Sequence, residues 1–333
     1  MLFRSQLDHD ARDQRLRQQL ARLDRASLSN ALHAYEQAIA RAPEDPVLHE
    51  NFATLLQDFG QPREAEQHWR KVLQVLPHSE HALFTLANLL DGEGRSAEAL
   101  PLYREALRRK PEGFEARSGL ALALGNLGRT AESIAEYERL IRLKPDFAEA
   151  RVNLGQTFAQ QGRAAEATAQ YLEAIRIQSN NVPARVNLGK LLAAEGKFRE
   201  AAGHYQEALR INPTNAIAHF NLGNTLSALG DATGAAGHFA EAVQHNPRFA
   251  EAHYNLGLGF AKQGRNAEAL THLAEAARLK PGFTEAQFNL GVALAKARRF
   301  EEAVACFNTT LRLDPNHALA KKFLEQAQGM KGL

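Results

Sequence analysis

Proline recurs at a fixed interval of 34 residues along most of the chain. The column consists of Pro43, Pro77, Pro111, Pro145, Pro213, Pro247, Pro281 and Pro315, with Ser179 in the one remaining slot. A period of this length is typical of stacked structural repeats, in which each unit buries its apolar face against its neighbours. We therefore expect one continuous repeat array, even though 333 residues would suffice for two globular domains.

Further columns share this period when each proline is given position 32 of a unit. Position 15 is glycine in seven units, position 20 is alanine or serine in all nine, and position 24 is aromatic in eight. The columns predict an N-terminal extension, nine units and a C-terminal capping helix with its tail. Their bounds are 1–11, then 12–45, 46–79, 80–113, 114–147, 148–181, 182–215, 216–249, 250–283 and 284–317, then 318–333.

Each column has a physical reason. A glycine at position 15 can adopt the left-handed conformation that closes one helix and turns the chain into the next. The small residues at positions 8 and 20 let the two helices approach closely, and the aromatic side chain at position 24 fills the space beside them. The proline lacks an amide hydrogen and ends the second helix. The pattern predicts an all-α protein with two helices in each unit and no β-sheet.

These residues resemble the tetratricopeptide repeat (TPR) family, whose pattern has Leu-Gly at positions 7 and 8, Gly at 15, Ala at 20, Phe or Tyr at 24 and Pro at 32. The resemblance implies a right-handed superhelical solenoid of about nine helix-turn-helix units. It is strongest where Asn-Leu-Gly occurs, which is similar to the TPR superhelix of O-linked N-acetylglucosamine transferase. These tripeptides are 153–155, 187–189, 221–223, 255–257 and 289–291. The ninth unit departs from the pattern, because Arg298 replaces the turn glycine.

The segment after the ninth unit has the pattern of an amphipathic capping helix. We expect its apolar side chains to cover unit nine while its charged ones face water. The apolar set is Leu319, Ala320, Phe323, Leu324 and Ala327. The polar set is Lys321, Lys322, Glu325 and Gln328.

Composition narrows the classes of partner and compartment. Forty basic and 38 acidic residues leave a net charge of +2, which is too balanced for an electrostatic nucleic-acid binder. The longest apolar stretch, 82–90, is about half the roughly 20 residues that span a bilayer, so we expect no membrane insertion. The single cysteine, Cys306, and the lack of a signal-peptide pattern favour a cytoplasmic protein. The oligomeric state has no signal in the sequence.

Histidines recur at two positions of the unit. His49, His219 and His253 share position 4, and His68, His204, His238 and His272 share position 23. Equivalent residues of successive units lie at least about 8–10 Å apart, too far to bind one zinc ion at about 2.0–2.1 Å. We therefore expect solvated surface histidines, with no metal site and no cofactor. The sequence also has no recognisable catalytic motif, so we expect no enzyme activity.

The resemblance to TPR proteins places ligand contacts on the first helix of each unit, along the concave side of the array. Position 6 carries Asn51, Asn153, Asn187, Asn221, Asn255 and Asn289. Because an asparagine side chain both donates and accepts, such a row can bind the backbone of an extended peptide. Beside the row, position 5 carries the aromatic residues Phe220, Tyr254 and Phe288.

We therefore predict a non-catalytic scaffold that binds an extended peptide or a partner helix of another protein. Two alternatives remain open. The asparagines can instead serve only local helix packing. The array can also be the substrate-recognition arm of a larger enzyme, such as a glycosyltransferase, whose catalytic domain is absent from this chain.

Overall fold

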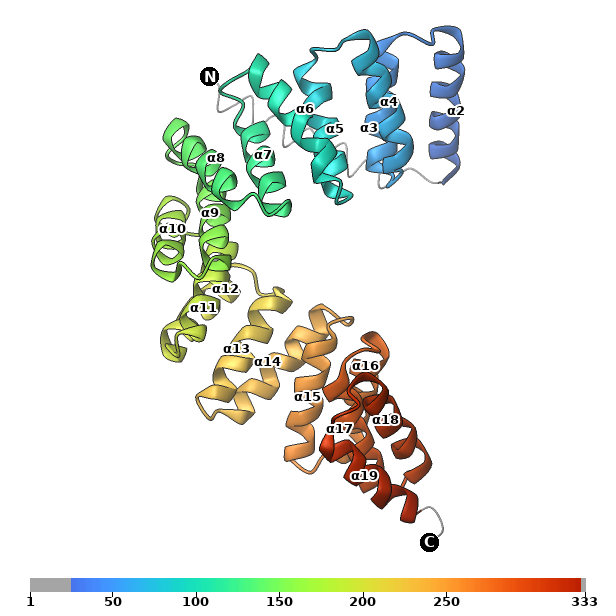
Figure 1. Cartoon of the computed structure of the whole chain (residues 1–333), viewed down its shortest axis with the longest axis vertical. Helices are drawn as coiled ribbons and strands as arrows, with labels where there is room; N and C mark the ends of the chain where they lie inside the picture. The colour runs from blue at the N-terminus through green and yellow to red at the C-terminus, as the bar shows by residue number, and fades with distance from the viewer. Residues whose placement is uncertain (1–24, 331–333) are drawn as a thin grey trace. The chain divides into compact units, whose positions relative to one another are not determined.

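The computed structural model describes residues 25–330, and every regular element in this range is an α-helix. The extension 1–11 and the predicted first helix of unit one therefore lie outside the described residues. Figure 1 shows the helices. They are α2 (Arg25–Arg41), α3 (Pro46–Asp58), α4 (Pro62–Val75), α5 (Glu80–Gly92), α6 (Ser96–Arg109), α7 (Phe114–Asn126), α8 (Thr130–Leu143), α9 (Ala148–Gln160), α10 (Ala164–Ile177), α11 (Val182–Ala194), α12 (Phe198–Ile211), α13 (Ala216–Ala228), α14 (Ala232–His245), α15 (Ala250–Lys262), α16 (Asn266–Leu279), α17 (Thr284–Lys296), α18 (Phe300–Leu313) and α19 (Ala318–Gly329).

Helices α3 to α18 follow the period of the sequence. The first helix of each pair covers positions 1–13 of a unit, and the second covers positions 17–30. The all-α solenoid fold predicted from the columns is thus confirmed. Contacts within the chain define two compact parts, divided between Pro145 and Asp146, so that α2–α8 belong to one part and α9–α19 to the other. No helix among the described residues is long and apolar enough to cross a membrane.

The turn between the paired helices has the left-handed backbone that position 15 predicts. All seven glycines of this column have φ between 71° and 87°. Arg298 has φ of 59° in the same column and is the one non-glycine residue with positive φ in the described part of the chain. The ninth unit therefore keeps the shape of the turn, although a side chain makes this conformation costly there.

Position 8 and position 24 hold the two helices of a unit together. A Cβ atom added to Gly223 would lie 2.7 Å from Cε1 of Phe239, closer than carbon atoms can approach without a shift. The same 2.7 Å contact with Cε1 recurs between Gly155 and Tyr171, Gly189 and Tyr205, and Gly291 and Phe307. The ring at position 24 thus lies directly on the backbone of the first helix. Small residues at position 8 are required because this ring occupies the place of a side chain.

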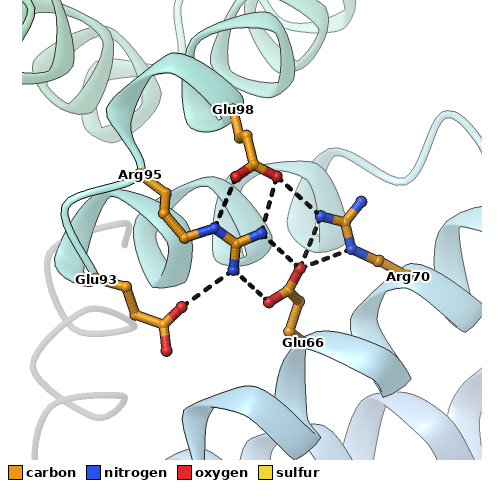
Figure 2. Close-up of polar contacts among 5 residues, drawn as sticks. All are labelled: Glu66, Arg70, Glu93, Arg95 and Glu98. Atoms are coloured by element: carbon orange, nitrogen blue, oxygen red, sulfur yellow. Dashed lines mark hydrogen bonds and ion pairs between the residues drawn. The ribbon is translucent and has the colours of Figure 1, made fainter.

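A cluster of charged side chains links the second helix of unit two to the second helix of unit three. Figure 2 shows Arg95, at the start of α6, bonded to Glu66 of α4 at 2.6 Å and to Glu98 at 2.7 Å. Arg70 contacts Glu66 at 2.7 Å and Glu98 at 3.5 Å. The hydrogen bond from Arg95 lowers the pKa of Glu66. The cluster therefore stays charged at neutral pH and orients α4 against α6.

Helix α19 caps the ninth unit largely as predicted. Ala320 and Ala327 are buried, and Phe323 packs against Phe307 of α18 with ring centroids 6.0 Å apart. Phe323 and Leu324 join the apolar cluster around Phe307. The prediction was wrong for Leu319, which is 53% exposed. Leu319 lies one turn before Phe323 but does not join the apolar cluster. The buried face of α19 is therefore smaller than the sequence pattern predicted.

Gly223→Leu should lower the free energy of unfolding by about 1–3 kcal/mol, because the new side chain overlaps Phe239. Gly237→Leu is the matched control in the same unit. Gly237 lies within the exposed face of α14, and nothing lies within 4 Å of an added Cβ there. Urea unfolding followed by circular dichroism measures both variants. Equal stability of the two variants would show that position 8 is not the close contact.

Arg298→Gly should stabilise the ninth unit by about 1 kcal/mol. Glycine removes the cost of the left-handed conformation, and its greater freedom in the unfolded chain offsets part of the gain. Hydrogen exchange across 284–317 should become slower. Arg299→Gly, one residue further on, is the control and should not slow exchange. Faster exchange in Arg298→Gly would contradict the interpretation.

Deletion of 318–333 should uncover the apolar surface around Phe307. Because each repeat contacts only its neighbours, the damage should stay local. Hydrogen exchange should accelerate across 284–317 and remain close to the parent across 148–215. The substitution Lys322→Ala, on the exposed face of α19, should leave both regions unchanged. Uniform loss of protection, or no loss at all, would show that 318–333 does not act as a local cap.

Candidate peptide-binding surface

The asparagine row is continuous only in the C-terminal part of the chain. Five of its members occupy position 6 in the first helices of five successive units, α9, α11, α13, α15 and α17. Asn51 in α3 stands apart, because position 6 of the next two units is Thr85 and Gly119. The row that can act as one surface therefore consists of Asn153, Asn187, Asn221, Asn255 and Asn289.

Two asparagines at the C-terminal end of the row connect neighbouring units. Asn255 donates from Nδ2 to Oδ1 of Asn224 at 2.8 Å, which joins α15 to α13. Asn289 donates from Nδ2 to the hydroxyl of Tyr254 at 3.1 Å and to the carbonyl of Glu285 at 2.8 Å. Here the amide groups serve the packing of the array, as one of the two interpretations of the sequence expects.

The other asparagines of the row have unused hydrogen-bonding capacity. The side chains of Asn153 and Asn187 are half-buried and make no hydrogen bond within the described residues. Nδ2 of Asn221 is buried without a partner. Asn51 is exposed. The half-exposed amides of Asn153 and Asn187 lie on neighbouring first helices, so they can bind the same ligand.

A hollow lies beside Asn153, between the fifth and sixth units. Its volume is about 510 Å³. Four amide side chains and one carboxylate lie in its wall, namely Asn153, Gln178, Asn180, Asn181 and Glu149. Asn181 is already occupied, because its Oδ1 caps α11 at the amide of Ala184 and its Nδ2 donates to Gln178. The hollow thus offers amide donors and acceptors to a ligand, beside the apolar side chain of Val152.

The aromatic residues at position 5 are largely engaged in packing. Phe220 contacts Phe249 with ring centroids 4.7 Å apart, and Tyr254 contacts Phe283 at 4.8 Å. Phe288 contacts the ring of His317 at 4.7 Å. In each case the partner occupies position 34 of the same unit. All three rings at position 5 are half-buried, so only part of each faces solvent.

The structure corrects the expectation of solvated surface histidines. His49, His219 and His253 are buried, with 4%, 8% and 7% of their surface exposed. Each pairs through Nδ1 with Nδ1 of the histidine at position 23 of its own unit. The pairs are His49–His68 at 2.7 Å, His219–His238 at 3.0 Å and His253–His272 at 3.0 Å. These contacts join positions 4 and 23 of one unit, whereas the expectation concerned equal positions of successive units.

The other nitrogen of each buried histidine ties its unit to the preceding one. Nε2 of His219 lies 2.9 Å from the carbonyl oxygen of Pro213, and His49 and His253 make the same contact with Pro43 and Pro247. Since a carbonyl only accepts, Nε2 carries the proton. Arginines replace histidine in this role in other units, where Arg117 bonds to Pro111 and Arg185 to Ser179.

The paired histidines at position 23 are less readily protonated than free histidine. Burial first, and then the neighbouring histidine, lowers the pKa of His68, His238 and His272. These rings are therefore neutral near pH 7. The sequence does contain a signal for the pairing. Every unit with histidine at position 4 also has histidine 19 residues later, at position 23.

Comparisons with known proteins agree with this architecture. The family model described as "Tetratricopeptide repeat" matches residues 50–114, 84–142, 118–182, 223–282 and 254–318. A second model, "TPR repeat", matches residues 189–230. No curated protein is significantly similar to the chain in sequence.

Several solved structures are also similar to the chain. The Cut9–Hcn1 hetero-tetramer of APC/C has a TM-score of 0.59 at 17% identity, covering 90% of this chain and 59% of the other, which shows a shared fold. YrrB, described as a TPR protein with an unusual peptide-binding site, has 25% identity, a TM-score of 0.48 and coverage of 56% and 96%. MamA has 24% identity, a TM-score of 0.45 and coverage of 51% and 93%.

The family models together cover well over half of the chain. The matched residues include the helix pairs, the left-handed turns at position 15 and the ring contacts at position 24. The chain therefore belongs to the tetratricopeptide repeat family.

Proposed function

We propose that this protein is a non-catalytic interaction scaffold that binds an extended segment of a partner protein along the first helices of units five to nine. Membership of the TPR family supports a role in protein interaction. The observation that carries the finer proposal is the pair of unoccupied, half-exposed amides of Asn153 and Asn187 on neighbouring helices α9 and α11.

The spacing of these amides suits a peptide backbone. Packed helices lie about 8–10 Å apart, so the first helices of successive units are separated by at least about three residues of an extended chain at roughly 3.3 Å each. A peptide that runs along the row can therefore offer a backbone amide or carbonyl to each asparagine in turn. Backbone contacts supply affinity for many sequences, and flanking side chains supply selectivity.

The surroundings of the row favour a polar ligand with some apolar side chains. The hollow beside Asn153 contains amides, the carboxylate of Glu149 and the methyl groups of Val152. A second hollow of about 240 Å³ adjoins Asn224 and Asn255 and includes Lys262 and Leu258. Glu149 in unit five and Lys262 in unit eight can each attract a side chain of opposite charge on the peptide.

Peptides selected from a random display library on the full chain provide the test. The double variant Asn153→Ala, Asn187→Ala should weaken several selected peptides of unrelated sequence by a similar factor. The loss should be about 1–3 kcal/mol for the pair, because each amide contributes about 0.5–1.5 kcal/mol. Fluorescence anisotropy with labelled peptides measures the affinity, and circular dichroism checks the fold.

Asn308→Ala is the matched control, because Asn308 is exposed on the second helix of unit nine and lies away from the row. It should leave the affinities unchanged. Unaltered binding by the folded double variant would leave the row with a purely structural role. Loss restricted to one peptide sequence would contradict recognition of the backbone.

A further inference from the structure

One unit carries a cluster of side chains that the packing of the array does not explain. In unit seven, ligand atoms of His219, Glu241 and His245 lie within 4.8 Å of one another. His219 belongs to α13, and the other two belong to α14. The Oε2 atom of Glu241 and the Nε2 atom of His245 are 3.4 Å apart. His238 adjoins this group through His219, because its Nδ1 lies 3.0 Å from Nδ1 of His219.

Comparison with the other units shows what is special about this one. Position 26 is glutamate in five units, and in four of them it pairs with an arginine at position 29. These pairs are Glu105–Arg108, Glu173–Arg176, Glu207–Arg210 and Glu275–Arg278. In unit seven position 29 is Gln244, and histidine occupies the next position. Glu241 has thereby exchanged an arginine partner for His245.

Two further histidine pairs in the chain serve as internal comparisons. Unit eight has His253, His272 and Glu275, but Leu279 stands at position 30 and Arg278 holds the glutamate. Unit two has His49 and His68 with Lys71 and Val75 at positions 26 and 30. The histidine pair therefore belongs to the repeat framework, whereas the third imidazole and the released carboxylate occur together only in unit seven.

The hydrogen bonds of His219 prepare it to coordinate a metal. Its Nε2–H donates to the carbonyl of Pro213 at 2.9 Å, which leaves the lone pair on Nδ1 facing His238. Histidine ligands of metals commonly donate their other ring hydrogen to a carbonyl in this way, which fixes the ring.

We propose that His219, Glu241 and His245 bind one zinc ion in unit seven, with His238 as the fourth ligand and third nitrogen donor. Imidazole and carboxylate groups are typical zinc ligands, and a tetrahedral site needs ligand atoms roughly 3.3 Å apart, given zinc–ligand distances of about 2.0–2.1 Å. The ligand atoms of His219, Glu241 and His245 now lie within 4.8 Å of one another, so the side chains must move closer together when zinc binds. Zinc reaches it from solvent, because 47% of the Glu241 side chain and 21% of the His245 side chain are exposed. This site joins positions within one unit and so differs from the ladder across units that the sequence argued against.

Calorimetric titration of the tag-free full chain with zinc chloride at pH 7.5, after dialysis against a chelator, tests the proposal. The parent should bind one zinc ion per chain. His245→Leu, which installs the residue of unit eight, should weaken binding by more than about 10-fold, since even the loss of an outer-shell partner costs about 10–100-fold. Gln244→Arg should also weaken binding, because the arginine recaptures Glu241. His272→Gln, in unit eight, is the matched control and should leave zinc affinity unchanged.

The reciprocal experiment gives unit eight the two features of unit seven, a histidine at position 30 and a glutamate without an arginine partner. The double variant Arg278→Gln, Leu279→His should raise the stoichiometry from one zinc ion to two. Circular dichroism of each variant checks that the helices remain. The proposal is overturned if the parent binds no zinc, if folded His245→Leu binds as tightly as the parent, or if the double variant still binds one ion.

Discussion

The contact between a small residue at position 8 and the side chain at position 24 sets the distance between the helices of each unit. At Gly155, Gly189, Gly223 and Gly291 the aromatic ring lies where a Cβ would be. The ring excludes water and fixes the rotation of both helices about their axes. Other contacts depend on this rotation. Only when position 24 faces position 8 does position 23 face position 4, where the polar pairs form.

The joints between units use a second and more variable set of contacts. The side chain at position 4 bonds to the backbone carbonyl at position 32 of the preceding unit, whether it is His219 or Arg185. Because the acceptor belongs to the backbone, Ser179 fulfils this role as well as proline does. Proline at position 32 thus serves to end the second helix. The hydrogen bond between units still forms when another residue replaces the proline. This explains how one unit departs from the most regular feature of the sequence without a change in its helices.

The fold was predictable from the sequence because each column reports a requirement of its own position. A left-handed turn requires glycine at position 15, and a close backbone contact requires a small residue at position 8. The polar pairs were not predicted, since they join two different positions whose relation depends on how the helices are rotated. The rotation of α19 also decides the exposure of Leu319. The sequence pattern included this residue in the apolar face, but its side chain is 53% exposed. For the candidate site, the sequence identified the asparagine row but not which members are occupied by their neighbours, as Asn255 is by Asn224.

The residues that hold the repeats together recur in most units, whereas position 6 and positions 26 to 30 differ from unit to unit. On the first helices, position 6 carries amides whose partners change along the row. On the second helices, positions 26 to 30 carry Glu–Arg ion pairs in four units and the histidine cluster in unit seven. Stability in such an array is approximately a sum over units and their interfaces. A ligand that binds only the folded form of one unit therefore stabilises that unit and its joints by mass action, while distant units keep their own stability. Zinc at His245 and a peptide at Asn153 would thus act on different helices of the same part of the chain, with little direct influence on each other.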